Sequence, residues 1–125
     1  MKCLILSLIF LSGCTTLNKR DCERANWYKL GLQDGEKGTY ELALAGYTKT
    51  CSKYKVTPDE EQYNKGRKVG IEEFCTEQKG FHVGVTRRDY PNVCPPEFKP
   101  NFDKGFKQGL EQAKTNSQRR RKKKG

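Results

Sequence analysis

The sequence predicts a small, mainly α-helical domain that is disulfide-stapled, with about four short helices and one ordered loop or small hairpin. Three observations predict it. A motif of one aromatic residue and two glycines occurs three times at helical spacing. Four cysteines lie among these repeats. Only 34% of the 125 residues are hydrophobic. We therefore expect a thin hydrophobic core that needs covalent support.

The motif aromatic-x-x-Gly-x-x-x-Gly occupies residues 28–35, 63–70 and 102–109. Positions i, i+3 and i+7 of an α-helix lie within about 60° of one another, so each aromatic residue shares a helix face with its two glycines. Six glycines inside helices cost roughly 6 kcal/mol relative to alanine. Close helix approach over glycine faces, with aromatic rings lying on them, would offset this cost. The repeat therefore predicts helices that pack through their glycines.

Capping signals place the helices between these motifs. Thr57-Pro58-Asp59-Glu60 predicts a helix to about Thr76, with Thr57 as its N-cap. The other expected helices span residues 21–38, 39–52 and 100–113. Residues 80–96 are rich in glycine, proline and short β-type runs, so we expect an ordered loop there, with a possible hairpin at Phe81–Val85.

The N-terminus has the features of an export signal. Lys2 precedes an apolar run over residues 3–11, about half the length that a membrane-spanning helix needs. The following Leu11-Ser12-Gly13-Cys14 resembles the lipobox of bacterial prolipoproteins. We expect cleavage before Cys14 and lipidation of its thiol. Several acyl chains would anchor the protein firmly.

The remaining cysteines are Cys22, Cys51, Cys75 and Cys94, and an exported chain enters an oxidising compartment. Four cysteines allow three pairings. We favour Cys22–Cys51, at the open end of a hairpin of the first two helices, and Cys75–Cys94, across the ends of the loop. A zinc site with His82 is disfavoured because no CxxC or HxxxH spacing occurs, and we expect no metal or cofactor.

The cysteines, glycines and aromatic residues together resemble a known family. The matching residues are Asp21-Cys22, Trp27-Tyr28, Gly31, Asp34-Gly35, Gly38, Tyr63, Gly66-Arg67, Gly70, Phe74-Cys75 and residues 90–95. Over residues 21–112 the chain resembles domain-of-unknown-function family 2799, a family of bacterial lipoproteins. The resemblance implies an exported, lipidated, small helical protein without an assigned activity.

A basic tail departs from that family pattern. Six residues contribute +6 of the net charge of +10: Arg119, Arg120, Arg121, Lys122, Lys123 and Lys124. We expect four segments: a signal peptide at 1–13, a lipidated tether at 14–20, a helical domain at 21–114 and a disordered tail at 115–125. Such a run binds anionic polymers, and export argues against nucleic acid. The candidates are lipopolysaccharide and peptidoglycan; a solvated tail without a partner is the alternative.

Signs of catalysis are weak. His82 is the only histidine and no free thiol is expected beside it, and GxSxG, HExxH and phosphate-binding glycine loops are missing. We expect Asp34, Glu72 and Glu73 to lie on solvated helix faces. The sequence therefore favours a non-enzymatic protein. A peptidoglycan hydrolase that uses Asp34 or Glu73 is the less favoured alternative.

We expect an envelope lipoprotein that binds another envelope component. The expected surface for a protein partner comprises Phe81, Arg87, Arg88 and Tyr90, although Tyr90 could equally pack beneath the loop. Thr15 follows the lipidated cysteine, whereas aspartate there usually marks retention at the inner membrane. This favours the outer membrane, facing the periplasm. Binding through the basic tail is the alternative function.

Overall fold

The structure is a computed structural model that describes residues 17–40 and 42–125. Within these residues it has six helices and no strand: α1 (Lys19–Arg24), α2 (Trp27–Glu36), α3 (Leu42–Ser52), α4 (Glu60–Phe74), α5 (Glu77–Val85) and α6 (Lys99–Lys124). The predicted fold class, a small and mainly helical domain, is confirmed. The expected signal peptide and the lipidation site Cys14 lie outside the described residues.

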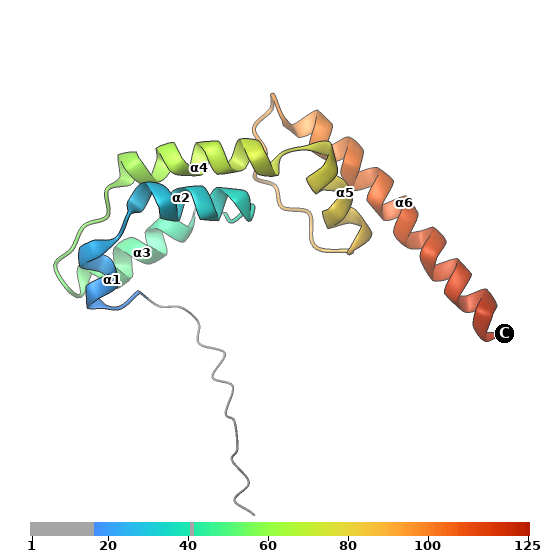
Figure 1. Ribbon diagram of the computed structural model, residues 1–125, viewed down its shortest axis with the longest axis horizontal. Helices are drawn as coiled ribbons and strands as arrows, with labels where there is room; N and C mark the ends of the chain where they lie inside the picture. The colour runs from blue at the N-terminus through green and yellow to red at the C-terminus, as the bar shows by residue number, and fades with distance from the viewer. Residues whose placement is uncertain (1–16, 41) are drawn as a thin grey trace, which may run out of the picture.

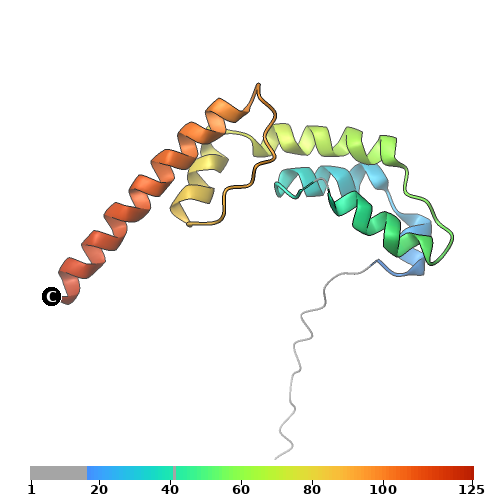
Figure 2. The same ribbon diagram turned by 180° about the vertical axis from the view of Figure 1, so that it is seen from behind.

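The helices form an arch (Figure 1). The first end of the arch holds α1 and the C-terminal end of α3. Helix α4 lies along its top above α2, and α5 and α6 descend side by side, with α6 continuing to the C-terminus at the other end. The view from behind shows the same shape, with both ends of the arch on the same side (Figure 2). Two closely packed helix pairs, α2 with α4 and α5 with α6, make up most of it.

Both pairs consist of parallel helices that touch through their glycines. A Cβ atom at Gly31 would lie 1.9 Å from the Tyr63 carbonyl oxygen, and one at Gly66 would lie 1.9 Å from the Tyr28 carbonyl oxygen. The second pair repeats this reciprocal contact between Gly80 of α5 and Gly105 of α6. The glycines one turn later, Gly35, Gly70, Gly84 and Gly109, also face backbone of the partner helix. Backbone therefore meets backbone, where we expected aromatic rings to cover the glycines.

A parallel pair needs a connection that returns to the start of the first helix, and a disulfide supports each connection. In the first half α3 returns toward the start of α2, and Cys51 on α3 bonds to Cys22 on α1. In the second half residues 86–98 return, and Cys94 in this loop bonds to Cys75 at the end of α4. The Cα atoms are 5.6 Å apart in both disulfides. These are the pairings that the sequence favoured.

Each half has its own small hydrophobic core. The first comprises Cys22, Trp27, Cys51 and Tyr63. The second comprises Ile71, Phe74, Cys75, Val83 and Phe102. Phe74 links the halves, because its ring faces Gly38 of the first half and stacks 5.3 Å from the Phe102 ring of the second. Gly38 has φ +67°, and a Cβ there would lie 2.5 Å from the Phe74 ring, so only glycine fits.

The expected loop or hairpin around Phe81–Val85 is wrong. These residues belong to α5, which begins where the Thr76 side chain accepts a hydrogen bond from the Lys79 amide. Gly80 and Gly84 form a fourth Gly-x-x-x-Gly pair, and their contact with α6 stabilises a helix whose local sequence favours a loop. The ordered loop begins only after α5. The N-cap of α4 also differs: it is Asp59, which accepts from the Gln62 amide, and not Thr57.

The expected disorder of residues 115–125 is also wrong. Helix α6 continues to Lys124 and is 26 residues long. Neither glycine nor proline interrupts it after Gly109, and alanine, glutamine, lysine and arginine are good helix formers. The basic residues in the last turn also interact favourably with the negative end of the helix dipole.

Candidate anion-binding surface

The C-terminal part of α6 is an exposed helix that carries only positive charge. No acidic residue follows Glu111. Residues 118–125 are all exposed, and the six successive cations Arg119–Lys124 occupy every side of the helix, since consecutive residues differ by 100°. This segment rises only about 9 Å along the axis. A charge of +6 is therefore concentrated in less than two turns.

Beyond its glycine contacts with α5, the C-terminal half of α6 is joined to the turn after α5 by Arg87. The Arg87 guanidinium donates hydrogen bonds to the Ala113 carbonyl oxygen at 3.3 Å and to Ser117 Oγ at 2.8 Å. Arg87 itself lies in the left-handed region, with φ 52°, at the turn that follows α5. The sequence predicts a role for Arg87 in a partner surface. In the structure its side chain positions α6.

Tyr90 is packed beneath the loop and is not an exposed recognition residue. Its ring lies 5.9 Å from the Phe102 ring and 5.1 Å from the Phe106 ring. Its hydroxyl donates to the Asp103 carboxylate and accepts from Lys99 Nζ at 2.8 Å. Burial raises the pKa of Tyr90. The packing that we considered as an equal alternative for this residue is the one observed.

Phe81, Arg87 and Arg88 of the expected surface are exposed. Phe81 on α5 is 37% exposed, and Arg88 lies in the loop that follows α5. Tyr90 is half-buried against the second core, so the four residues do not all belong to one exposed patch.

A half-open groove of about 720 Å³ lies elsewhere, between α4, the start of α3 and the loop before α6. Its lining mixes apolar side chains, including Ile71, Val93 and Phe98, with charged ones from α4. Leu42 at its margin is 79% exposed. Motif reasoning missed this groove, because its walls are distant in sequence.

Asp34 is buried, so the expected solvated position is wrong for this residue. It is 8% exposed, and its Oδ2 accepts hydrogen bonds from Tyr47 at 3.0 Å and from Tyr63 at 2.7 Å. Burial raises the pKa of Tyr47 to about 12, and the Asp34 charge adds to this shift. Burial, followed by the hydrogen bond to Asp34, also raises the pKa of Tyr63. The three side chains form an interior polar network.

The remaining catalytic candidates are all exposed. Glu72 and Glu73 are exposed on α4, and His82 is exposed on α5. In the part of the chain that the structure describes, no group of three or more His, Cys, Asp or Glu side chains is placed to hold a metal ion. None of the helices there is both long and apolar enough to cross a membrane.

Comparisons with known proteins identify the family. No curated protein and no solved structure matches the chain. The sequence model of one family, described as Protein of unknown function (DUF2799), matches residues 26–111. This match contains α2 to α5, most of α6 before its basic end and all eight glycines of the two helix pairs. The chain therefore belongs to the DUF2799 family.

Proposed function

We propose that this protein is a lipid-anchored, non-enzymatic component of a bacterial envelope, and that the basic end of α6 binds an anionic envelope polymer, lipopolysaccharide or peptidoglycan. One observation carries the proposal: six consecutive cations lie on an exposed helix that extends past the folded body, with no acidic residue nearby in sequence. We place the protein at the outer membrane, facing the periplasm.

The charge of the helix end favours binding to clustered anions. Arg119–Lys124 contains three pairs of cations three residues apart and two pairs four residues apart. Each like-charge pair on a helix costs about 0.2–0.5 kcal/mol, so repulsion destabilises this end by roughly 1–2.5 kcal/mol at low salt. Phosphates or carboxylates along the helix would remove the repulsion and release counterions. Binding should therefore be steeply salt-dependent and should stabilise the helix.

Residue types that often serve in catalysis, a buried carboxylate and cysteines, have structural roles in this domain, which supports a non-enzymatic protein. The Asp34 carboxylate bonds to two tyrosines in the interior. The four cysteines of the domain form disulfides, which suit an oxidising compartment outside the cytoplasm. Because rigid disulfides and glycine contacts hold both halves, the fold suits a scaffold that presents α6 at a fixed distance from the anchor.

The test measures binding of the lipidated protein to purified sacculi and to lipopolysaccharide at low and moderate salt. In the tail variant, glutamine replaces all six residues Arg119–Lys124, which keeps helix propensity and removes the charge. A matched control loses the same charge from the body through glutamine at Lys29, Lys37, Lys65, Lys68, Lys79 and Lys107, which are all exposed.

The proposal predicts that the wild type and the body control bind at least one polymer and release it as salt rises, whereas the tail variant does not bind. Equal binding by the tail variant would overturn the proposal.

A further inference from the structure

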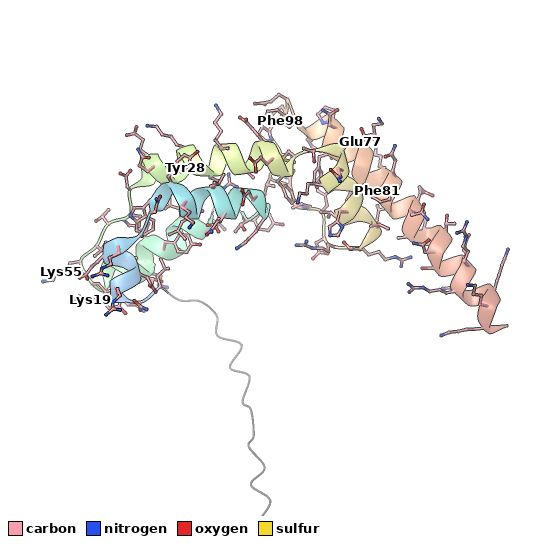
Figure 3. The ribbon with its side chains drawn as sticks, viewed as in Figure 1. Lys19, Tyr28, Lys55, Glu77, Phe81 and Phe98 are labelled. Atoms are coloured by element: carbon pink, nitrogen blue, oxygen red, sulfur yellow. A yellow bond between two sulfur atoms is a disulfide. The ribbon has the colours of Figure 1, made fainter. Side chains whose placement is uncertain are left out.

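The end of the arch opposite the α6 terminus is also basic. Six exposed cations lie on α1, on the last turns of α3 and on the turn that follows: Lys19, Arg20, Arg24, Lys49, Lys53 and Lys55. Figure 3 labels Lys19 and Lys55 together at this end. The two carboxylates of α1 are Asp21, which completes the capping box with Asn18, and Glu23, which lies 3.9 Å from Lys19. Asp59 lines the same hollow as Arg24, so six cations against three carboxylates leave a net charge of +3 at this tip.

A tyrosine lies between two of these lysines in an ordered turn. The Tyr54 amide donates to the Cys51 carbonyl oxygen at 3.0 Å, and the Lys55 amide donates to the Ser52 carbonyl oxygen at 3.1 Å. Lys55 has φ 58°, which reverses the chain, and the Cys22–Cys51 disulfide holds the base of the turn. Tyr54 is 37% exposed at this turn. Tyrosine flanked by lysines is typical of the membrane interface, where the ring lies at headgroup level and the ammonium groups reach phosphates.

The same tip is the part of the domain nearest in sequence to the proposed anchor. Leu17, three residues after Cys14, packs against the core cluster of Cys22 and Cys51, together with Val56. Three residues span at most about 10 Å. A lipid on Cys14 would therefore keep Leu17, which lies just before α1, within about that distance of the bilayer surface.

We propose that this basic tip, formed by α1 and the Lys53-Tyr54-Lys55 turn, is a membrane-docking surface for the anionic lipid headgroups of the membrane that holds the anchor. The inference rests on the lipid anchor of the proposed function, and it adds a second contact that fixes how the arch stands on the bilayer. An anchor at Cys14 alone would leave the orientation of the arch undetermined. Tyr54 in the membrane interface and lysines bound to lipid phosphates would fix the orientation of the arch on the bilayer.

The experiment reconstitutes the lipidated protein in phosphatidylcholine vesicles, with or without phosphatidylglycerol, that contain lipids brominated in their acyl chains. A reporter variant carries Tyr54→Trp, and a matched control variant carries Tyr40→Trp, at an exposed tyrosine outside the tip. The native Trp27 is buried and gives the same background fluorescence in both variants. Unfolding temperatures of both variants near the wild-type value establish that the fold is intact.

The proposal predicts that bromine quenches the indole of the Tyr54→Trp reporter on vesicles with phosphatidylglycerol, and that the indole of the Tyr40→Trp control is not quenched. Adding Lys53→Gln and Lys55→Gln to the reporter should abolish the quenching, since each basic residue near an anionic surface changes the partition constant about fivefold. Reporter quenching no greater than that of the control, or unchanged by the lysine substitutions, would overturn the docking surface.

Two arms separate this proposal from the proposed function. The α6 end is also cationic and lies on the same side of the arch (Figures 1 and 2), so the Tyr54→Trp reporter is repeated with glutamine at Arg119–Lys124. Persistent quenching of the reporter supports the tip, and loss of quenching assigns the docking to α6 and refutes the proposal. The mass of the mature protein reports acylation. An acylated chain with an unquenched reporter refutes only the docking surface, whereas an unacylated chain refutes the anchor itself.

Discussion

Substitution of one glycine tests the packing that the whole arch depends on. Gly66 of α4 is the position of choice, because a Cβ there would lie 1.9 Å from the backbone carbonyl oxygen of Tyr28. Ordinary contact begins near 3.4 Å, so in Gly66→Ala helices α2 and α4 must separate by about 1.5 Å. No flexible side chain can move aside, because the contacting atom is backbone. Gly46, inside α3, is the matched control, since nothing lies within 4 Å of a Cβ there.

The two alanine variants should shift stability in opposite directions. Alanine in a helix is favoured over glycine by about 1 kcal/mol, so Gly46→Ala should raise the unfolding temperature by roughly 2–8 °C. Overpacking costs about 3 kcal/mol where neither side can yield, which exceeds the propensity gain at Gly66 by about 2 kcal/mol. Gly66→Ala should therefore lower the unfolding temperature by roughly 4–16 °C.

The assay is thermal unfolding followed by far-ultraviolet circular dichroism, with the disulfides intact in both variants. A Gly66→Ala protein as stable as the wild type, or more stable, would refute the backbone contact between α2 and α4. A similar loss in Gly46→Ala would show that the effect is not specific to the glycine interface.

Three further predictions follow from the interior and the disulfides. Asp34→Ala leaves the Tyr47 and Tyr63 hydroxyls without their acceptor and should lower the free energy of unfolding by about 1–3 kcal/mol in urea titrations, with partial rescue by Asp34→Asn. Because the folded protein raises the pKa of Tyr47 to about 12, the protonated hydroxyl stabilises the fold below pH 10, and this contribution is lost as pH rises from 10 to about 12. Absorbance of tyrosinate should therefore show one or more tyrosines that titrate late and together with unfolding. Titration of every tyrosine near pH 10 would contradict this prediction. Replacing Cys22 and Cys51 by serine should cost about 3–4 kcal/mol, whereas an unchanged urea midpoint would argue against this disulfide in the folded protein.

Local signals in the sequence predicted much of the fold. The three motif copies lie on α2, α4 and α6, and the favoured cysteine pairs are the ones that form. The motif could not show which copy pairs with which, because a glycine face fits any other glycine face. The fourth copy escaped notice because Glu77 replaces the aromatic residue and the segment resembles a loop. Its helix is stabilised by α6, a contact between distant segments.

The functional residues were harder to predict for the same reason. Arg87 and Tyr90 have the residue types of a recognition surface, yet the fold uses them against α6. Asp34 has the residue type of a solvated helix position, and its burial depends on Tyr47 and Tyr63, which belong to two other helices. The basic run is visible in the sequence. Its helical form depends on the continuous helix before it and on the hydrogen bonds from Arg87 to α6.

Photo-crosslinking in living cells tests the central claim most directly. A photoreactive residue at Gln118, next to the basic run, samples what the end of α6 contacts in the envelope. The account predicts adducts with lipopolysaccharide or peptidoglycan, and their loss when glutamine replaces Arg119–Lys124. A discrete protein adduct that persists in the glutamine variant would contradict it, and would move the functional surface from the basic helix to the folded arch.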